Sequence, residues 1–144
     1  NQILSPSDFG LHNIILNKNN VHFIDFEYFG WDDPVKLCAD FVWHPSNKLN
    51  TNLAQFWIKS MIGIFSEDKD FQKRLDVSLP FYGMRWIMII LNEFFPEYII
   101  RRRLAGNMKS SVNKSIQNIQ LTKAIKYCKD IEKLIDFKLK KNFV

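Results

Sequence analysis

Hydrophobic and polar residues near the start of the chain follow a strand-like pattern. A short apolar run at residues 14–16 and an alternating segment at 21–26 flank four polar residues, 17–20, three of which are Asn. Apolar, β-branched segments on either side of an Asn-rich turn are typical of a β-hairpin. The pattern predicts two antiparallel strands joined by a four-residue loop. Further loops are predicted over residues 1–13, where Pro, Ser and Gly interrupt any periodicity, and over residues 29–32.

The rest of the chain has helical spacing, with apolar residues recurring every three or four positions. Asp33 followed by Pro34 is a helix start, with Asp as the N-cap and Pro at the first helical position, and Pro45 ends that helix. Further helices are predicted at residues 51–65, 68–77, 80–95, 96–103 and 113–141. The segment 80–95 is apolar nearly all round, which predicts a buried central helix. In the last helix one apolar stripe consists of Leu121, Ile125, Cys128, Ile135 and Leu139.

The predicted fold class is therefore mainly α (α+β), a small β-hairpin followed by about five or six helices. No repeat, low-complexity segment or Gly/Ser linker divides the 144 residues, so residues 1–144 are predicted to form a single domain.

Composition and charge narrow the class of protein. Hydrophobic content of 47% and charged content of 24% are ordinary for a soluble globular protein. The net charge of +5 suits an anionic ligand such as a nucleotide, but no basic stripe interleaved with aromatic residues indicates nucleic acid. Cys38 and Cys128 are expected to be reduced core thiols of a cytoplasmic protein. No apolar run approaches the ~20 residues of a membrane span, so no membrane partner is expected.

The candidate chemistry lies around the hairpin. Asp8 is followed at five positions by Asn13, and the returning strand carries Asp25. Phosphoryl transfer needs a carboxylate to accept the proton of the attacking hydroxyl and oxygen ligands for Mg²⁺. One Asp-x-x-x-x-Asn pair is common by chance at this composition. The hairpin gives it weight, because paired strands lie only about 5 Å apart and return the second carboxylate to the first.

Residues 4–45 resemble the catalytic core of the aminoglycoside phosphotransferase and choline kinase group, the protein-kinase-like small-molecule kinases. In that group the catalytic loop usually reads His-Gly-Asp-x-x-x-x-Asn, and here residues 6–13 read PSDFGLHN. The segment IDFEY at residues 24–28 is similar to the metal-binding motif of the group, and Asp33-Pro34 to the acidic Asp-Pro that opens its next helix.

The resemblance implies the helical C-lobe of an ATP- and Mg²⁺-dependent phosphotransferase that acts on a hydroxyl of a small molecule, such as an aminoglycoside, choline or another amino alcohol, or a sugar-like compound. It makes Asp8 the catalytic base and Asn13 and Asp25 the Mg²⁺ ligands. Ile15 and Ile24 would form the apolar floor of the adenine pocket.

Three residues just past the metal motif, Glu27, Trp31 and Asp32, are candidates for binding the acceptor. Trp31 offers a cation–π face to a cationic group. The alternative for these residues is a solvated loop with one packed indole.

The histidines and Asp40 are expected to have structural roles. No His has a second His or Cys at ligand spacing, so His12, His22 and His44 are not expected to form a metal set. His12 is expected to support the catalytic loop, and His22 and His44 to be structural. Asp40, among apolar neighbours, is expected to anchor the catalytic loop by hydrogen bonds.

Two departures from the family pattern keep other functions open. Pro6 stands where the group has His, and only seven residues precede Asp8, where a Gly-rich loop, a strand Lys and a helix Glu would be expected. The expected partner is therefore the missing N-lobe of the same protein, without which this chain should be inactive. One alternative is a kinase-like binding or regulatory module, a pseudokinase. Another is a helical interaction domain whose aspartates are coincidental.

Overall fold

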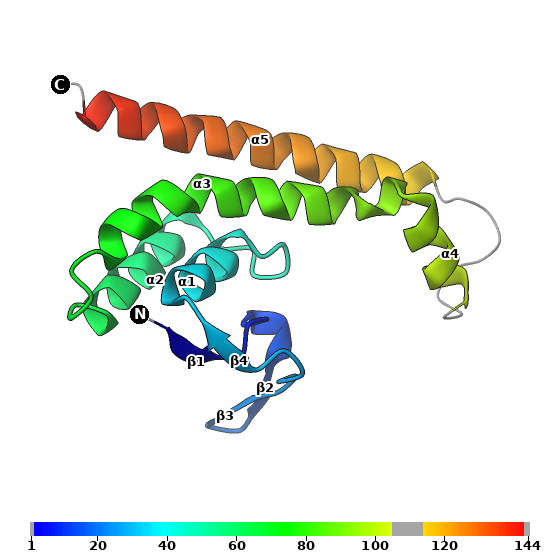
Figure 1. The fold of residues 1–144 in the computed structure, drawn as a ribbon. Coiled ribbons are helices and arrows are strands. Elements are labelled where there is room, and N and C mark those ends of the chain that lie inside the picture. Colours follow the sequence, from blue (N-terminus) through cyan, green and yellow to red (C-terminus); the bar gives the residue numbers. More distant parts are fainter. Residues whose placement is uncertain (1, 105–113, 143–144) are drawn as a thin grey trace. The chain divides into compact units, whose positions relative to one another are not determined.

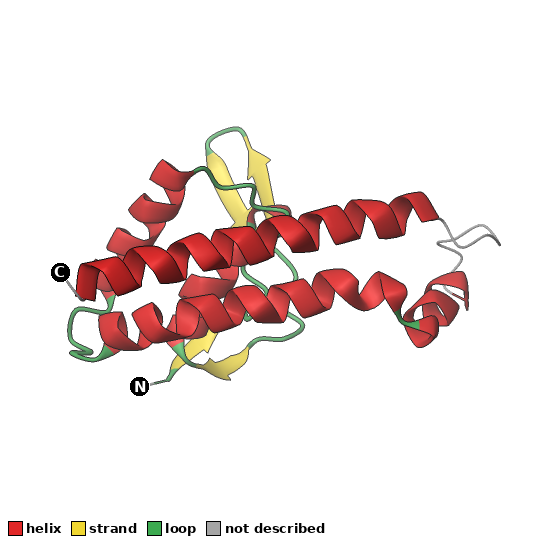
Figure 2. Cartoon of the chain, turned by 90° about the horizontal axis from the view of Figure 1, so that it is seen from above, coloured by secondary structure: helices red, strands yellow, loops and turns green. Residues whose placement is uncertain are grey.

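The computed structural model describes residues 2–104 and 114–142 and is mainly helical (Figure 1). These residues belong to two compact units, Asn1–Tyr82 and Gly83–Val144, which are described separately here. Figure 2 shows the strands in yellow, and all of them belong to the first unit. Among the described residues, no helix has both the length and the hydropathy needed to span a bilayer.

The predicted hairpin is present. Strands β2 (Ile14–Asn17) and β3 (Asn20–Phe23) pair antiparallel, in the register Ile14↔Phe23 to Asn17↔Asn20. Two residues join them rather than the four predicted, and the first of these, Lys18, has a φ of 53°. The second strand ends at Phe23 instead of 26, because Asp25 adopts a left-handed backbone with φ of 64° and leaves the extended conformation.

A second small sheet lies where the sequence predicted loops. Strand β1 (Ile3–Ser5) pairs antiparallel with β4 (Gly30–Asp32), and Ser5 lies opposite Gly30. The loop predictions were wrong here, because strands of three residues are too short to produce a readable alternation. The pairing places the beginning of the Asp8 loop beside the segment that leads into the first helix.

The first two helices begin as predicted. Helix α1 (Pro34–Trp43) has Asp33 as its N-cap, whose carboxylate accepts the Val35 N–H at 2.8 Å. Helix α2 (Thr51–Ile64) is capped by Asn50, which accepts the Leu53 N–H at 2.9 Å. Apolar residues from α1, α2 and the start of the next helix are buried in this unit: Val35, Cys38, Ala39, Phe41, Trp43, Met61, Phe71, Leu75 and Leu79.

The two helices predicted at 68–77 and 80–95 are one continuous helix, α3 (Phe71–Ile90), which contains Pro80. The 3₁₀ turn η2 (Leu91–Phe94) follows. The expectation of a helix buried all round was also wrong, because Phe81, Met84 and Met88 are exposed.

In the second unit, helices α4 (Pro96–Leu104) and α5 (Lys114–Asn142) follow η2. The Gln117 side chain donates to the Glu93 carbonyl at 3.2 Å and joins α5 to η2. On α5 the buried residues are Ala124 and Ile131, whereas Leu121, Ile125, Cys128 and Ile135 of the predicted stripe are exposed. The Leu139 side chain and position 113 lie outside the described residues.

The two thiols differ in a way that can be measured. Cys38 is fully buried, and burial raises the pKa of its thiol to about 12, whereas Cys128 is exposed. We expect a thiol reagent at pH 8 to modify the folded chain at Cys128 and to reach Cys38 only after unfolding, since the thiolate is the reactive form. Mass spectrometry with and without urea tests this, with Cys128→Ser as the control that should leave the folded chain unmodified. Equal rates at both thiols would contradict the burial of Cys38.

Candidate functional site

Asp8 lies in a tight loop between β1 and β2. Ser7, immediately before it, has a φ of 62°, and the Ser7 N–H donates to the Ser5 hydroxyl at 3.1 Å. Ser5 itself is buried in β1. The Asp8 side chain is 39% exposed, so the carboxylate can be reached from solvent.

Two imidazoles approach the two oxygens of this carboxylate. His12 Nε2 lies 3.5 Å from Asp8 Oδ2, and His44 Nε2 lies 3.8 Å from Oδ1. The two rings stack on each other, with centroids 4.2 Å apart and planes 8° apart. The sequence did not indicate that these two imidazoles meet, and they do so because the fold brings the end of α1 to the loop. His22 lies on β3, outside this cluster.

The environment of His44 favours its neutral form. Burial lowers the pKa of the His44 imidazole and the neighbouring His12 lowers it further, while the carboxylates of Asp8 and Asp40 act in the opposite direction. The Ser46 N–H donates to His44 Nδ1 at 3.2 Å. Because Nδ1 accepts a hydrogen bond, the proton of the neutral ring is placed on Nε2, the nitrogen that faces Asp8.

Asn13 connects the two halves of the predicted motif. Its side chain is buried, and Nδ2 donates to the Asp8 carbonyl at 2.9 Å. Its own carbonyl accepts the Ile24 N–H at 3.0 Å, which extends the hairpin by one pair. Asp25 therefore follows directly after the residue that pairs with Asn13, and its side chain is exposed.

The pKa of the Tyr28 hydroxyl is affected by the carboxylates near the hairpin. A hydrogen bond with Glu27 and the charge of that carboxylate raise the pKa of the exposed Tyr28 hydroxyl, and the charges of Asp25 and Asp8 raise it further. Three carboxylates thus act on one phenol. The segment after the hairpin and the loop before it contribute to the same negative region.

The hairpin presents Ile15 and Ile24 on one face. Ile15 lies opposite His22, and Ile24 follows His22 by two residues, so the alternation of the strands puts Ile15 and Ile24 on one side. Ile15 is 50% exposed and Ile24 42% exposed. Phe23 belongs to the other face, where its ring packs 5.4 Å from that of Phe9.

The three candidate acceptor residues differ in their surroundings. Both carboxylate oxygens of Asp32 already have partners within the protein. Oδ1 accepts the Asp33 N–H at 2.9 Å, and Oδ2 forms an ion pair with Lys36 at 2.8 Å. Trp31 is 67% exposed, so the alternative of a packed indole was wrong. Glu27 is exposed and interacts with Tyr28.

Lys36 ties the start of the loop to α1. Its Nζ donates to the Ser7 hydroxyl at 2.7 Å, in addition to the ion pair with Asp32. The buried Asp40 carboxylate lies 3.5 Å from the same Nζ. Asp40 therefore acts on the loop through Lys36.

Two further residues that hold the loop were not identified from the sequence. Phe9 packs against Phe41 and Trp57, with ring centroids 5.6 and 6.0 Å away. The buried Asn47 accepts the Leu11 N–H at 2.8 Å and donates to the Phe41 carbonyl at 2.7 Å. Asn47 stands in a polar stretch after Pro45 that resembles any surface loop, so no sequence signal marks it.

Replacing Asn47 by Ala is expected to lower the free energy of unfolding by about 1–3 kcal/mol, because it leaves the part-buried Leu11 N–H and the buried Phe41 carbonyl without this partner. The control is Asn52→Ala, at an exposed position of α2, which should change stability by less than ~0.5 kcal/mol. Urea denaturation of both variants measures the difference. Equal, small effects would show that Asn47 does not hold the loop.

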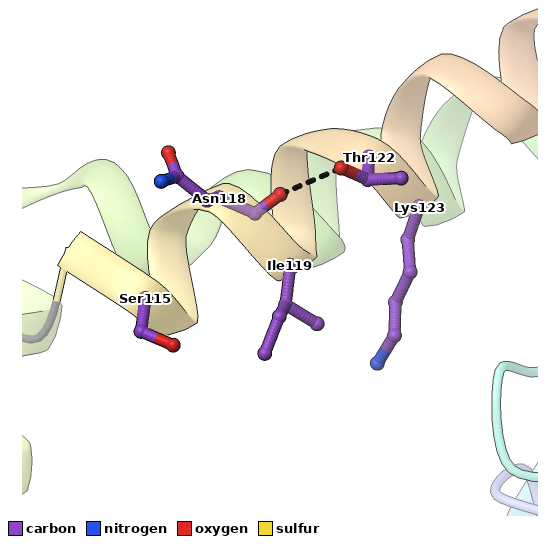
Figure 3. A pocket seen from close by; sticks show the side chains of 5 residues that line it. All are labelled: Ser115, Asn118, Ile119, Thr122 and Lys123. Carbon is purple, nitrogen blue, oxygen red and sulfur yellow. Dashed lines mark hydrogen bonds between the residues drawn. The ribbon is translucent and has the colours of Figure 1, made fainter.

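The second unit carries a shallow pocket along one face of α5 (Figure 3). Its described lining residues are Ser115, Asn118, Ile119, Thr122 and Lys123. The Thr122 hydroxyl donates to the Asn118 carbonyl at 2.9 Å, as Figure 3 shows. None of the site residues predicted from the sequence lines this pocket.

Comparison of the chain with protein-family models, with curated proteins and with solved structures gives no match.

Proposed function

We propose that this chain is the C-lobe of an ATP- and Mg²⁺-dependent phosphotransferase and carries its catalytic base and metal ligands. The enzyme would transfer the γ-phosphate of ATP to a hydroxyl of a small molecule. The observation that carries the proposal is the double role of Asn13. Its side chain bonds to Asp8 and its carbonyl to Ile24, the residue before Asp25. These two bonds join the backbone segments that carry Asp8 and Asp25 to one buried residue.

The roles follow from the chemistry of these groups. Asp8 would accept the proton of the attacking hydroxyl as a general base. The bond from Asn13 Nδ2 to the Asp8 carbonyl leaves Oδ1 as the metal ligand, and the exposed Asp25 carboxylate is the second. Both are hard oxygen donors of the kind Mg²⁺ prefers. The ion, when bound, neutralises charge on the transferring phosphate.

The surrounding surface fits a nucleotide and an acceptor. The exposed apolar face at Ile15 and Ile24 would pack against the adenine ring. Glu27 and Trp31, both exposed, would hold an aminoglycoside, an amino alcohol or a sugar-like acceptor. Asp32 is left out of this role, because Lys36 and the Asp33 N–H already engage its two oxygens.

Mn²⁺ as a paramagnetic substitute for Mg²⁺ tests the metal assignment. In the complete protein with ATP, we expect Mn²⁺ to broaden the amide signals of Asn13 and Asp25. Asp25→Asn should weaken Mn²⁺ binding at least about 10-fold, the lower end of what the loss of an outer-shell partner causes. Asp136→Asn, at an exposed position of α5, is the control. Unchanged Mn²⁺ affinity in Asp25→Asn would refute the ligand set.

A second candidate function is a kinase-like binding or regulatory module without catalysis. It is favoured by one observation, that His12 and His44 approach both oxygens of Asp8. A module of this kind would bind ATP and Mn²⁺ at Asn13 and Asp25 and would transfer no phosphate. The two functions therefore separate on turnover and not on binding.

A further inference from the structure

We propose that Asp8, His12 and His44 form a binding site for a transition-metal ion, with Zn²⁺ as the representative ion, separate from the Mg²⁺ ligands Asn13 and Asp25. Each of the three residues offers one ligand atom, and these atoms all lie within 4.8 Å of one another. His12 Nε2 lies 3.5 Å from Asp8 Oδ2, and His44 Nε2 lies 3.8 Å from Asp8 Oδ1, the other oxygen of the same carboxylate.

The three ligand atoms are near enough for side-chain rotation to bring them onto one ion. With zinc–ligand bonds of about 2.0–2.1 Å, tetrahedral geometry puts neighbouring ligand atoms about 3.3 Å apart. The three ligand atoms, all within 4.8 Å of one another, would have to move closer together, and the stacked rings of His12 and His44, whose planes are 8° apart, would have to rotate so that both Nε2 atoms point at the ion. The side chains of Asp8 and His12 are partly exposed, so an ion can enter from solvent. Three protein ligands leave a fourth position for water.

The ligand types distinguish this site from the Mg²⁺ site. Two imidazoles and one carboxylate suit Zn²⁺, Co²⁺ or Ni²⁺, whereas Mg²⁺ takes oxygen ligands and keeps most of its waters. Asn13 and Asp25 offer oxygen atoms alone. The two sets of residues, Asp8 with the two imidazoles and Asn13 with Asp25, would therefore select different ions.

The His44 ring provides a marker of occupancy. In the empty site Nδ1 accepts the Ser46 N–H, so the ring proton is on Nε2. A metal bonded to Nε2 takes the place of that proton, and the neutral ring then carries its proton on Nδ1. Nδ1 can no longer accept from Ser46, so the Ser46 amide loses its partner when the ion binds.

Occupancy has a consequence for the carboxylate. A bound ion uses the Asp8 lone pairs that would accept a hydroxyl proton, so Zn²⁺ would inhibit phosphate transfer. Only this consequence rests on the proposed function. Binding of the ion does not depend on it.

The test is a titration of the complete protein with ZnCl₂ by calorimetry, repeated with Co²⁺ by visible absorption. We expect one ion per chain and the absorption of four-coordinate Co²⁺, unaffected by excess Mg²⁺. His12→Gln and His44→Gln should each weaken Zn²⁺ binding at least 10-fold. His22→Gln is the matched control, at the remaining His of the chain, and should bind as the unmodified protein does.

A measurement on the unmodified protein protects the test from variants that misfold. Zn²⁺ should shift the Ser46 amide resonance in two-dimensional NMR, while Mg²⁺ should leave it in place. Absence of stoichiometric binding, unchanged affinity in folded His12→Gln and His44→Gln, or an unmoved Ser46 amide at saturating Zn²⁺ would each overturn the proposal. In that case the imidazoles only orient the Asp8 carboxylate.

Discussion

Replacing Asp8 by Asn is expected to slow phosphate transfer by about 10²- to 10⁴-fold, the usual contribution of a general base. The amide keeps the shape of the carboxylate but cannot accept the hydroxyl proton. Transfer is measured in the complete protein at saturating Mg²⁺ and ATP, by coupling ADP release to NADH oxidation. Asp136→Asn, an identical change at an exposed position of α5, is the control and should retain the full rate.

The Asp8 variant should fold normally, which distinguishes a chemical from a structural role. The side chain is 39% exposed, and Asn13 bonds to the Asp8 backbone carbonyl, which the substitution leaves in place. We expect the free energy of unfolding to change by less than ~0.5 kcal/mol. A full transfer rate in Asp8→Asn would remove the base assignment, whatever the stability.

Replacing Phe71 by Ala is expected to cost about 3–5 kcal/mol of stability, the range for a buried aromatic side chain. Phe71 begins α3 and is 1% exposed, and its ring lies 5.1 Å from that of Phe65. The substitution leaves a cavity that rigid neighbours fill only in part. The matched control is Phe81→Ala, in the same helix, where the side chain is 64% exposed.

Urea denaturation followed by tryptophan fluorescence measures both variants. Trp43 and Trp57 lie in the same unit as the two Phe residues and report on its unfolding. Phe81→Ala should lose less than ~1 kcal/mol, since surface substitutions usually have small effects. Similar losses in the two variants would contradict the burial of Phe71.

Local signals explain which parts of the fold could be predicted. The Asn-rich turn and the Asp33-Pro34 start of α1 act over a few residues, so the sequence located them. The strands β1 and β4 were not predicted, because each has only three residues and their pairing joins segments that are distant in the sequence. The sequence predicted two helices that meet near Pro80, whereas the structure has the single helix α3, which contains Pro80. A contact from α1 reaches this region. The Trp43 indole donates to the Leu79 carbonyl at 2.8 Å and fixes the backbone immediately before Pro80.

In the candidate site too, the residues linked by local signals could be predicted, and those linked over long sequence separations could not. The spacing from Asp8 to Asn13 and the hairpin that returns to Asp25 are local, so the sequence could place these residues together. His44 and Asn47 act on the loop from beyond α1, and the bond from Leu11 to Asn47 joins residues 36 positions apart. Separations of this size carry no periodicity. On α5 the sequence identified an amphipathic helix, but the buried face, at Ala124 and Ile131, depends on packing.

The proposed activity is tested most directly by mixing the complete protein with Mg²⁺, ATP and a pool of hydroxylated amines and sugars. The phosphorus signals of this mixture are then followed by ³¹P NMR. We expect the γ-phosphate signal of ATP to fall while ADP and a new phosphate monoester appear, and Asp8→Asn to slow this conversion by about 10²- to 10⁴-fold. Binding of ATP and Mn²⁺ at Asn13 and Asp25 with no monoester from any acceptor would contradict the account and leave the non-catalytic binding module.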